Sequence, residues 1–338
     1  MSSLEVTWFL LIGVLLTVYA ILDGFDLGVG SMYIFAKKDS HRRKLLSSVG
    51  PFWDGNEVWL LTGAGAIFAA FPHVYATVFS GFYLAMMLVL FALIFRAVSL
   101  EYRNKQDSDS WRKGWDLAFW LGSALPALLL GVALGNVVRG LPLDAQMNFT
   151  GNFFTLLNPY ALAFGLLGLA MFVTHGAIFA KLRTDGELAQ QVAGWASKSW
   201  WAYLSLLLVV HVTTVVTEQH LISNFLSVPV LWLVPALGLA MVILIKVYLA
   251  KARYGLAFVF SSLAIAFHMA TVGAGIFPNM VFAINDPKLS LTISTASSSS
   301  LTLMVMLVMA LVGMPIVLGY TIWVYRAFAG KVEVDSGY

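Results

Sequence analysis

Acidic side chains occur inside two of the most apolar stretches of the sequence. Asp23 and Asp26 lie in the segment DGFDLGVG, and Asp54 and Glu57 lie in GPFWDGNEVWL. The members of each pair are three residues apart, so each pair shares one face of a helix. An ionisable group in hydrocarbon costs about 2.5–3.5 kcal/mol on insertion scales and is rare without a function. Carboxyl groups in such places can relay protons, so proton transfer is the chemistry that these residues suggest.

The first pair is predicted to lie deep in a membrane. With Lys37 as the inner end of the helix, Asp26 and Asp23 are about 16 and 21 Å from it, at ~1.5 Å per residue. Gly24 and Gly28 have the spacing of small residues that allows close helix contact. The segment therefore predicts either a polar path or a tight helix contact with hydrogen-bonded acids. The cost of two acids at this depth favours the polar path.

The second pair lies at the start of a helix, within about two turns of the inner surface. Negative charge is favourable at a helix N-terminus, which gives Asp54 an ordinary structural explanation. Glu57, with Asn56 beside it, is harder to explain in this way. Arg96 ends the third apolar segment at the same level and is the natural ion-pair partner of these acids. As an alternative, Arg96 only follows the excess of basic residues on the inner side.

Three histidines also lie in apolar segments, namely His175, His211 and His268. A pair of transmembrane histidines can bind haem b through both axial positions. Single histidines in helices more often form a hydrogen bond with a neighbour, so we expect this chain to bind no haem and no metal. Glu218, near the outer end of a helix, is expected at the membrane–water interface. The chain has no cysteine, which excludes thiolate metal sites and Fe–S clusters in it.

The composition shows which class of protein carries these residues. The 338 residues are 60% hydrophobic and 11% charged, whereas a soluble domain is roughly 45–50% apolar and about 25% charged. This excludes an ordinary soluble enzyme, a disordered chain and a fibrous protein. No segment has the pattern of a nucleotide-binding loop, and we expect no nucleic-acid partner.

Nine continuous apolar segments are long enough to cross a ~30 Å hydrocarbon core. They lack the alternation of barrel strands, so they are expected to be helices. The sequence predicts an all-α integral membrane protein whose residues 1–338 form a single polytopic domain. The predicted helices cover 4–36, 51–71, 76–97, 115–138, 159–180, 200–222, 229–249, 256–278 and 301–325.

The distribution of basic residues predicts the orientation of these helices. With the N-terminus outside, all of the 20 Lys and Arg residues except Arg139 and Lys288 lie in inner loops, at inner helix ends or in the inner tail. An error in the helix count would exchange inner and outer loops and destroy this pattern. We therefore predict nine helices with the N-terminus outside and the C-terminus inside. No basic residue precedes the first segment, which favours a retained helix over a cleaved signal peptide.

The two acidic motifs resemble those of subunit II of the cytochrome bd-type quinol:oxygen oxidases. The similarity extends over essentially the whole chain. WDGNEVW is its most specific motif, since it places an acid pair and two Trp at the start of a membrane helix. Other matching segments are FAAFP at 68–72, FSGFYLAM at 79–86, IFRAV and EYR around Arg96 and Arg103, TGNFFTLLNP at 150–159, HG at 175–176, FVFSSL at 258–263, IFP at 276–278 and the YTIWVYRAF tail.

The resemblance implies a fold of two four-helix bundles plus a peripheral ninth helix in a prokaryotic cytoplasmic (inner) membrane. It implies a heterodimer with a larger subunit I that carries haem b, haem d and the quinol site. It leaves open whether a b-type haem replaces haem d and whether small single-helix subunits bind. Subunit II of this family binds no haem, and in some members it holds a lipid-like quinone in a structural role.

The resemblance also assigns residues. Its Trp-Asp pair corresponds to Trp53 and Asp54, and its arginine at the end of the third helix corresponds to Arg96. With Asn56, Trp53 and Arg96 are expected at the interface that faces subunit I and its haems. The connection at 222–228 is much shorter than the long outer loop of some relatives, so contacts made by such a loop are not expected.

Our hypothesis is that this accessory subunit supports subunit I and contributes to the proton path, and to oxygen access, for the reduction of dioxygen to water. The residues proposed for the path are Asp23, Asp26, Asp54 and Glu57. Two alternatives remain open. The same acids could serve a proton- or sodium-coupled secondary transporter, or the chain could be a purely structural scaffold. Haem absorption that co-purifies with a larger chain would exclude the transporter.

Overall fold

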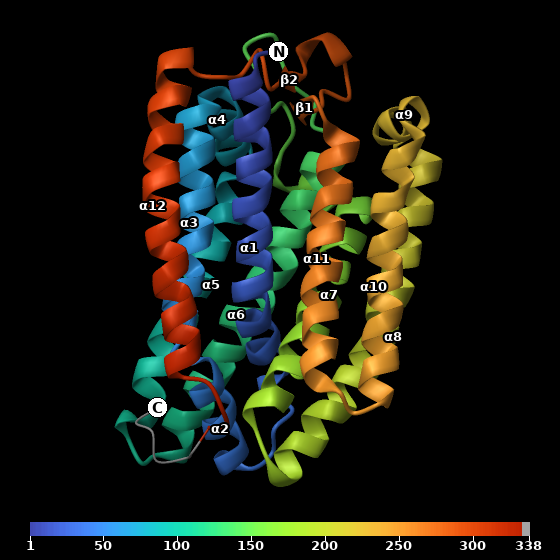
Figure 1. Cartoon of the computed structure of the whole chain (residues 1–338). Helices are drawn as coiled ribbons and strands as arrows, with labels where there is room; N and C mark the ends of the chain where they lie inside the picture. Colours follow the sequence, from blue (N-terminus) through green and yellow to red (C-terminus); the bar gives the residue numbers. More distant parts are fainter. Residues whose placement is uncertain (333–338) are drawn as a thin grey trace.

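The computed structural model of the chain describes residues 1–332. Most of these residues form long helices that stand side by side (Figure 1). Eight helices are long and apolar enough to cross a membrane. They are α1 (Ser3–Tyr33), α5 (Tyr83–Tyr102), α6 (Asp109–Arg139), α7 (Pro159–Arg183), α8 (Gly186–Thr217), α10 (Leu233–Ala250), α11 (Tyr254–Ile276) and α12 (Ser300–Ala327).

The predicted ninth span depends on α3 (Trp53–Ala70). This helix has 18 residues and lies beside α1 and α12 (Figure 1). Its first turns contain Asp54, Asn56 and Glu57, which lower the hydropathy of a helix that is already short. For this reason α3 is not among the eight apolar helices. The nine-helix count remains a prediction.

The shorter elements lie at the two ends of the molecule (Figure 1). One end, which we call the strand end, holds the N-terminus, α4 (Pro72–Gly81), α9 (Gln219–Ser227) and the antiparallel strands β1 (Asn279–Val281) and β2 (Leu291–Thr292). The opposite end, the α2 end, holds α2 (Asp39–Val49) and the end of α12. The 3-10 helices are η1 (Arg103–Lys105), η2 (Phe153–Leu157), η3 (Pro229–Trp232) and η4 (Pro287–Leu289).

Several helix bounds differ from those expected from hydropathy. The segment expected at 76–97 is divided, since α4 ends at Gly81 and α5 starts at Tyr83. At Gly81 a Cβ would lie 2.8 Å from Phe149, so a loop packs closely against this break. The helix expected at 200–222 starts at Gly186 and ends at Thr217. Its first turns are polar, and hydropathy marks only the apolar part of a helix.

Helix α1 lies at the centre of the fold and packs against α3, α6, α7, α11 and α12. From Asp23 to Tyr33 every residue of α1 is buried. The contact with α7 is a contact between backbones, because a Cβ at Gly28 would lie 1.8 Å from the carbonyl oxygen of Phe172. A Cβ at Gly176 of α7 would lie 2.5 Å from the amide nitrogen of Val29. The glycines of DGFDLGVG therefore serve the close helix approach that their spacing predicts.

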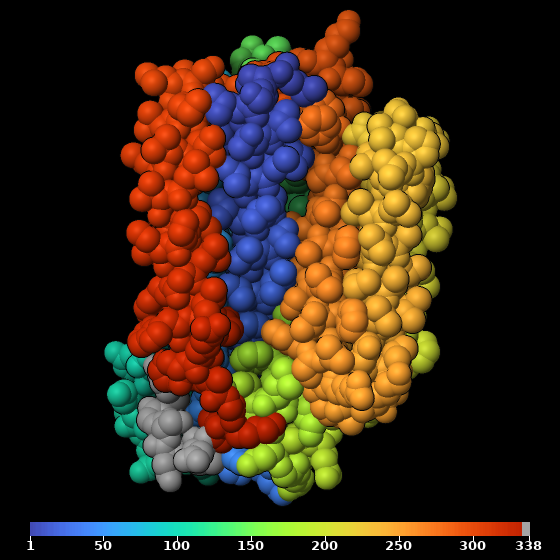
Figure 2. Space-filling model, viewed as in Figure 1, coloured from blue at the N-terminus to red at the C-terminus, as the bar shows by residue number. Residues whose placement is uncertain are grey.

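Helix α12 lies at the edge of the molecule, as its position in Figure 2 shows. It contacts α1 and α3, and Leu303 is its one buried residue among those described. This position agrees with a peripheral last helix. The division of the other helices into two four-helix bundles remains a prediction.

The contact at Gly28 can be tested by adding one methyl group. Because the Phe172 carbonyl cannot move without shifting α7, Gly28→Ala is expected to cost about 1–3 kcal/mol. Gly13→Ala on the same helix is the matched control, since a Cβ there meets nothing within 4 Å. The measurement is the thermal unfolding temperature of the purified protein. Equal unfolding temperatures for the two variants would contradict the contact described above.

Candidate functional site

A buried ion cluster joins three helices in the half of the molecule toward the α2 end. Arg96 of α5 donates to both carboxylate oxygens of Asp23 in α1, at 2.7 and 3.2 Å. The same guanidinium lies 3.2 Å from Glu57 of α3 and 4.0 Å from Asp26 of α1. Arg96 is 1% exposed, and neither aspartate is exposed at all. We call these four residues the Arg96 cluster.

A hydrogen-bond chain extends from the cluster to α12. The side-chain amide of Asn56 donates to Asp26 Oδ2 at 2.7 Å. Its carbonyl oxygen accepts a hydrogen bond from the Tyr325 hydroxyl at 3.0 Å. Asp26 Oδ1 is buried and has no hydrogen-bond partner among residues 1–332. One oxygen of this carboxyl is therefore held in place, and the other is free to bind a proton.

The position of Arg96 is determined by the packing of α5 against α6. A Cβ at Gly122 of α6 would lie 2.7 Å from the Arg96 amide nitrogen and 2.6 Å from the Ala92 carbonyl oxygen. The two backbones are in contact there, which fixes the Arg96 backbone against α6. The Arg96 side chain extends toward α1, where the aspartates supply the charge that a buried arginine requires.

The charges of the cluster do not balance. Three carboxyl groups surround one guanidinium, so full ionisation would leave an excess of negative charge in an apolar interior. Such an excess is costly, and binding a proton reduces it. Acceptance and release of protons is therefore the chemistry that this arrangement can perform.

Asp54 does not belong to the cluster. The predicted contact of Arg96 is present for Glu57, whereas Asp54 is exposed on the outer face of α3. It follows the same helical stripe as Val58 and Leu61, which are also exposed. Asp54 and Glu57 are three residues apart, and this rotation is enough to place one at the edge of the buried face and the other beyond it.

The three residues expected at a partner interface are placed differently from one another. Trp53 is half-buried at the start of α3 and packs against the core. Asn56 and Arg96 are buried within the chain, at 2% and 1% exposure. Neither side chain reaches the surface, because Asp26 and Asp23 hold them inside. Only Trp53 is placed to touch a partner directly.

The histidines have partners within the protein. His175 contacts Ser261 at 2.6 Å and the Ile21 carbonyl at 3.0 Å, and it stacks on Phe258. His211 contacts the Leu207 carbonyl at 2.8 Å.

His268 contacts the Tyr203 hydroxyl at 2.7 Å, and its Nδ1 is buried with no partner among the described residues. Glu218, which was expected at the membrane–water interface, is 9% exposed, and its carboxylate lies 3.6 Å from the Arg139 guanidinium.

A cavity of about 320 Å³ lies between the helices on the strand side of the cluster. Its wall is mostly apolar and comes mainly from α1, α6, α7, α8, α9 and α11, with single residues from α3, α4 and α10. His211 and His268 are among its few polar wall residues, and Tyr19, one turn before Asp23 on α1, lines it as well. The polar cluster and the apolar cavity are therefore neighbours along α1.

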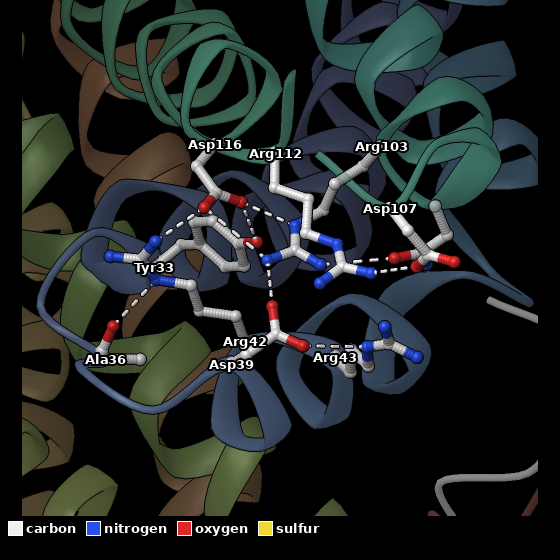
Figure 3. A network of polar contacts seen from close by, with 10 residues as sticks. Tyr33, Ala36, Asp39, Arg42, Arg43, Arg103, Asp107, Arg112 and Asp116 are labelled. Atoms are coloured by element: carbon white, nitrogen blue, oxygen red, sulfur yellow. Dashed lines mark hydrogen bonds and ion pairs between the residues drawn. The ribbon is translucent and has the colours of Figure 1, made fainter. Parts of the chain in front are cut away.

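A second ion network, at the α2 end, was not predicted from the sequence (Figure 3). Asp116 of α6 accepts hydrogen bonds from Tyr33, Arg42 and Arg103, each at 2.5 Å. Arg103, which is 1% exposed, also donates to Asp39 at 2.6 Å. This network joins α1, α2, η1 and α6. The excess of basic residues in inner loops concealed it, because that excess accounts for an arginine in a loop without any partner.

Asp39 shows the electrostatic effect of this network outside the membrane helices. Partial burial opposes its ionisation, but hydrogen bonds and positive charge from Arg103 and Arg43 outweigh it and lower the pKa of Asp39 below its ordinary value. The carboxylate form is therefore the one that joins α2 to η1.

Comparison with known proteins identifies the family. Residues 4–328 match the model of the cytochrome bd terminal oxidase subunit II family. The chain belongs to this family. Cytochrome bd-I ubiquinol oxidase subunit 2 of Escherichia coli (strain K12) is 39% identical, over 98% of this chain and 96% of that protein. Cytochrome bd ubiquinol oxidase subunit 2 of Bacillus subtilis (strain 168) is 35% identical, over 98% of both chains.

A solved structure shares the fold. The bd oxidase from Geobacillus thermodenitrificans contains a chain that matches with a TM-score of 0.80 at 17% identity, over 97% of this chain and 99% of that one. As a member of the subunit II family, the chain is a multi-pass subunit of a terminal oxidase in the bacterial inner membrane. A subunit II implies a partner subunit I.

The network at Asp116 predicts a large effect on stability. Asp116→Asn leaves Arg42 and Arg103 without their shared counter-charge, and breaking a buried ion pair costs about 3–5 kcal/mol. Asp107→Asn is the control, since the Asp107 side chain is 99% exposed and its pair with Arg112 is screened by water. Thermal unfolding of the purified complex is the measurement. The prediction is wrong if Asp116→Asn unfolds at the temperature of the control.

Proposed function

We propose that this chain is the second subunit of a respiratory quinol:oxygen oxidoreductase and that it contributes part of the proton path for dioxygen reduction. Membership of the subunit II family supports the first part, and the Arg96 cluster supports the second. The relatives from E. coli and B. subtilis carry the name ubiquinol oxidase, which makes a quinol the proposed electron donor.

The reaction itself requires a proton path. Reduction of one dioxygen to two waters consumes four electrons and four protons. Quinol supplies the electrons, and protons taken from the inner side must cross protein to reach a buried oxygen site. Carboxyl groups that can bind and release a proton without leaving the protein lower the barrier to that transfer.

The described contacts suggest an order along the path. Asp54 is exposed on α3, at the α2 end, and in this scheme it takes up the proton. Glu57 lies three residues further along the helix and contacts Arg96. The Arg96 guanidinium also contacts Asp23 and Asp26, so it keeps the three carboxyl groups within reach of one another. Arg96 acts in this scheme by charge pairing, while the acids carry the proton.

The cofactors are proposed to belong mainly to the partner. Haem b and haem d, or a b-type haem in its place, are expected on the larger subunit I, and small single-helix subunits and membrane lipid are further proposed partners. Dioxygen, which is apolar, could also reach subunit I along the lipid-facing helices. No residue of this chain is assigned to the oxidation of quinol or to the binding of oxygen.

A structural quinone fits the cavity between the helices. The wall is mostly apolar, which suits an isoprenoid chain, and the buried Nδ1 of His268 has no partner among residues 1–332. When the Tyr203 hydroxyl donates to Nε2, Nδ1 carries a proton and can donate it to a quinone carbonyl. The quinone would contribute packing and one hydrogen bond at this place.

Family membership does not favour the alternative of a secondary transporter.

The topology is part of the proposal. With α3 as a ninth span, the N-terminus lies outside and the α2 end faces the cytoplasm, so that Asp54 lies on the side that supplies protons. A reporter fused after Tyr338 is then expected to be cytoplasmic, and one inserted near Asn148 is expected to be external. Phosphatase activity and the fluorescence of fluorescent-protein fusions in whole cells show on which side of the membrane each reporter lies. The reverse result at either site would exclude the nine-helix arrangement.

The proton path predicts a specific loss of turnover. Asp26→Asn and Asp54→Asn keep the shape of the side chain but remove its exchangeable proton. The complex is expected to assemble with full haem content and to be reduced rapidly by quinol. Steady-state oxygen consumption per haem is expected to fall ~10-fold, which corresponds to about 1.4 kcal/mol on the limiting barrier.

Asp109→Asn is the matched control for these variants. Asp109 is an exposed acid in the first turn of α6, as Asp54 is in α3. Normal oxygen consumption in both Asp26→Asn and Asp54→Asn would exclude the proton path and leave the structural scaffold as the remaining role. A loss in Asp26→Asn only would remove Asp54 from the path.

Trp53→Phe is expected to act on assembly of the complex and not on turnover, since it removes an indole at the surface.

A further inference from the structure

The residues that follow α12 are attached to the end of α7. Residues 328–332, which we call the C-terminal strap, cross the α2 end toward α7 (Figure 2). The Arg183 guanidinium at the end of α7 donates to the carbonyl oxygens of Phe328 and Gly330, the latter at 2.6 Å. The amide of Val332 donates to the Arg183 carbonyl at 2.9 Å. One side chain of α7 thus fastens the strap at two points.

Lys331 strengthens this attachment. Its ammonium group donates to the carbonyl oxygens of Thr184 at 2.7 Å and Lys181 at 3.1 Å. These carbonyls belong to the end of α7, where a positive charge is favourable and the last carbonyls lack partners within the helix. The strap therefore also caps α7.

The strap places Tyr325 in a stack of aromatic rings. The Tyr325 ring stacks on Phe52 with 4.6 Å between centroids, and it meets Phe25 edge-on. The Arg183 guanidinium lies over the other ring of this stack, 5.4 Å from the Phe52 centroid. Arg183 thus contacts both the strap and the ring that stacks on Tyr325.

The Tyr325 hydroxyl is one of the groups that orient the Asn56 amide. The Leu22 carbonyl oxygen also accepts a hydrogen bond from the amide nitrogen, at 3.3 Å. Asn56 is 2% exposed, and its amide group can face Asp26 with either its nitrogen or its oxygen. The hydroxyl donates to the amide oxygen, which leaves the amide nitrogen to donate to Asp26. Without this donor the amide oxygen would be buried and unpaired. Turning that oxygen toward the Asp26 carboxyl would give no relief, because it would then also face the Leu22 carbonyl.

We propose that the C-terminal strap holds Tyr325 as a positioning residue, which orients the Asn56 amide and, through it, the Asp26 carboxyl for proton transfer. The inference rests on the proposed function of the Arg96 cluster. It gives the last helix a role in turnover, although that helix contributes no acid. Leu303 is the one buried residue of α12, so the helix itself supplies little precision, and the strap supplies what the helix lacks.

The test uses the intact two-subunit complex with Tyr325→Phe. Haem content, the rate of haem reduction by quinol and the KM for quinol are expected to equal those of the unchanged protein. The maximal rate of oxygen consumption is expected to fall about 5-fold, the effect of losing one buried hydrogen bond. Infrared spectra of the oxidised and reduced complex are expected to show a shifted carbonyl stretch of the buried carboxyl groups, which a merely structural role would leave in place.

Two further variants serve as control and as a second test. Tyr320→Phe makes the same change on the same helix at a side chain that is 63% exposed, and it is expected to change nothing. Arg183→Ala leaves the hydroxyl in place but releases the strap, and it is expected to reproduce the loss of turnover. If it fails to assemble, the comparison of Tyr325→Phe with Tyr320→Phe still decides.

Asp26→Asn, measured in parallel, separates the two proposals. Low turnover in Asp26→Asn with normal turnover and an unshifted carbonyl stretch in Tyr325→Phe would overturn the role of Tyr325 alone. Normal turnover in Asp26→Asn would overturn the proton path, and with it the inference about Tyr325. Normal turnover in an assembled Arg183→Ala complex would overturn the role of the strap.

Discussion

The structure around the cluster depends on one constraint, namely that the buried guanidinium of Arg96 must be surrounded by negative charge. Leaving such a group unpaired costs more than the pair itself contributes, so the ion contacts determine position more than they add stability. Helix α5 is packed against α6 at Gly122, and the Arg96 guanidinium contacts acids of α1 and α3. The acids of these two helices lie where the guanidinium can meet them. The register of α1, α3 and α5 is therefore determined by charge as well as by packing.

Glycine allows this arrangement in the centre of the molecule. The segment that carries Asp23 and Asp26 also brings α1 into backbone contact with α7. A helix with larger residues there would stand further from its neighbours and would leave room for lipid or water beside the acids. Close contact excludes both, so the carboxyl groups of Asp23 and Asp26 interact with Arg96 and Asn56 instead of with bulk water. The same short motif thus supplies the acids and the apolar surroundings that make them costly.

Much of this could be predicted from the sequence, and the rest could not for a physical reason. Acids at helical spacing in apolar segments indicated buried polar groups, and the common membrane level of Glu57 and Arg96 indicated their contact. The closer pair of Arg96 with Asp23 was not predicted. The face of α3 that carries Asp54 could not be derived, because three residues of spacing leave a rotation that packing decides. Tyr325 lies 269 residues from Asn56, and no local pattern links the two. Arg103 looked like an ordinary loop residue, because the excess of Lys and Arg in inner loops already explained its presence.

The Arg96 cluster and the apolar cavity lie close together along α1, so the proposed proton path runs beside the proposed quinone site. Tyr19, one turn of α1 from Asp23, lines the cavity, so about one helical turn separates the Arg96 cluster from the apolar cavity along α1. A water-filled cavity would let protons leave the path toward the strand end, whereas an apolar wall offers them no partners. An apolar occupant would exclude water further. On this argument the cavity need not take part in chemistry to matter for it: by remaining dry it would limit the proton path to the carboxyl groups that face Arg96.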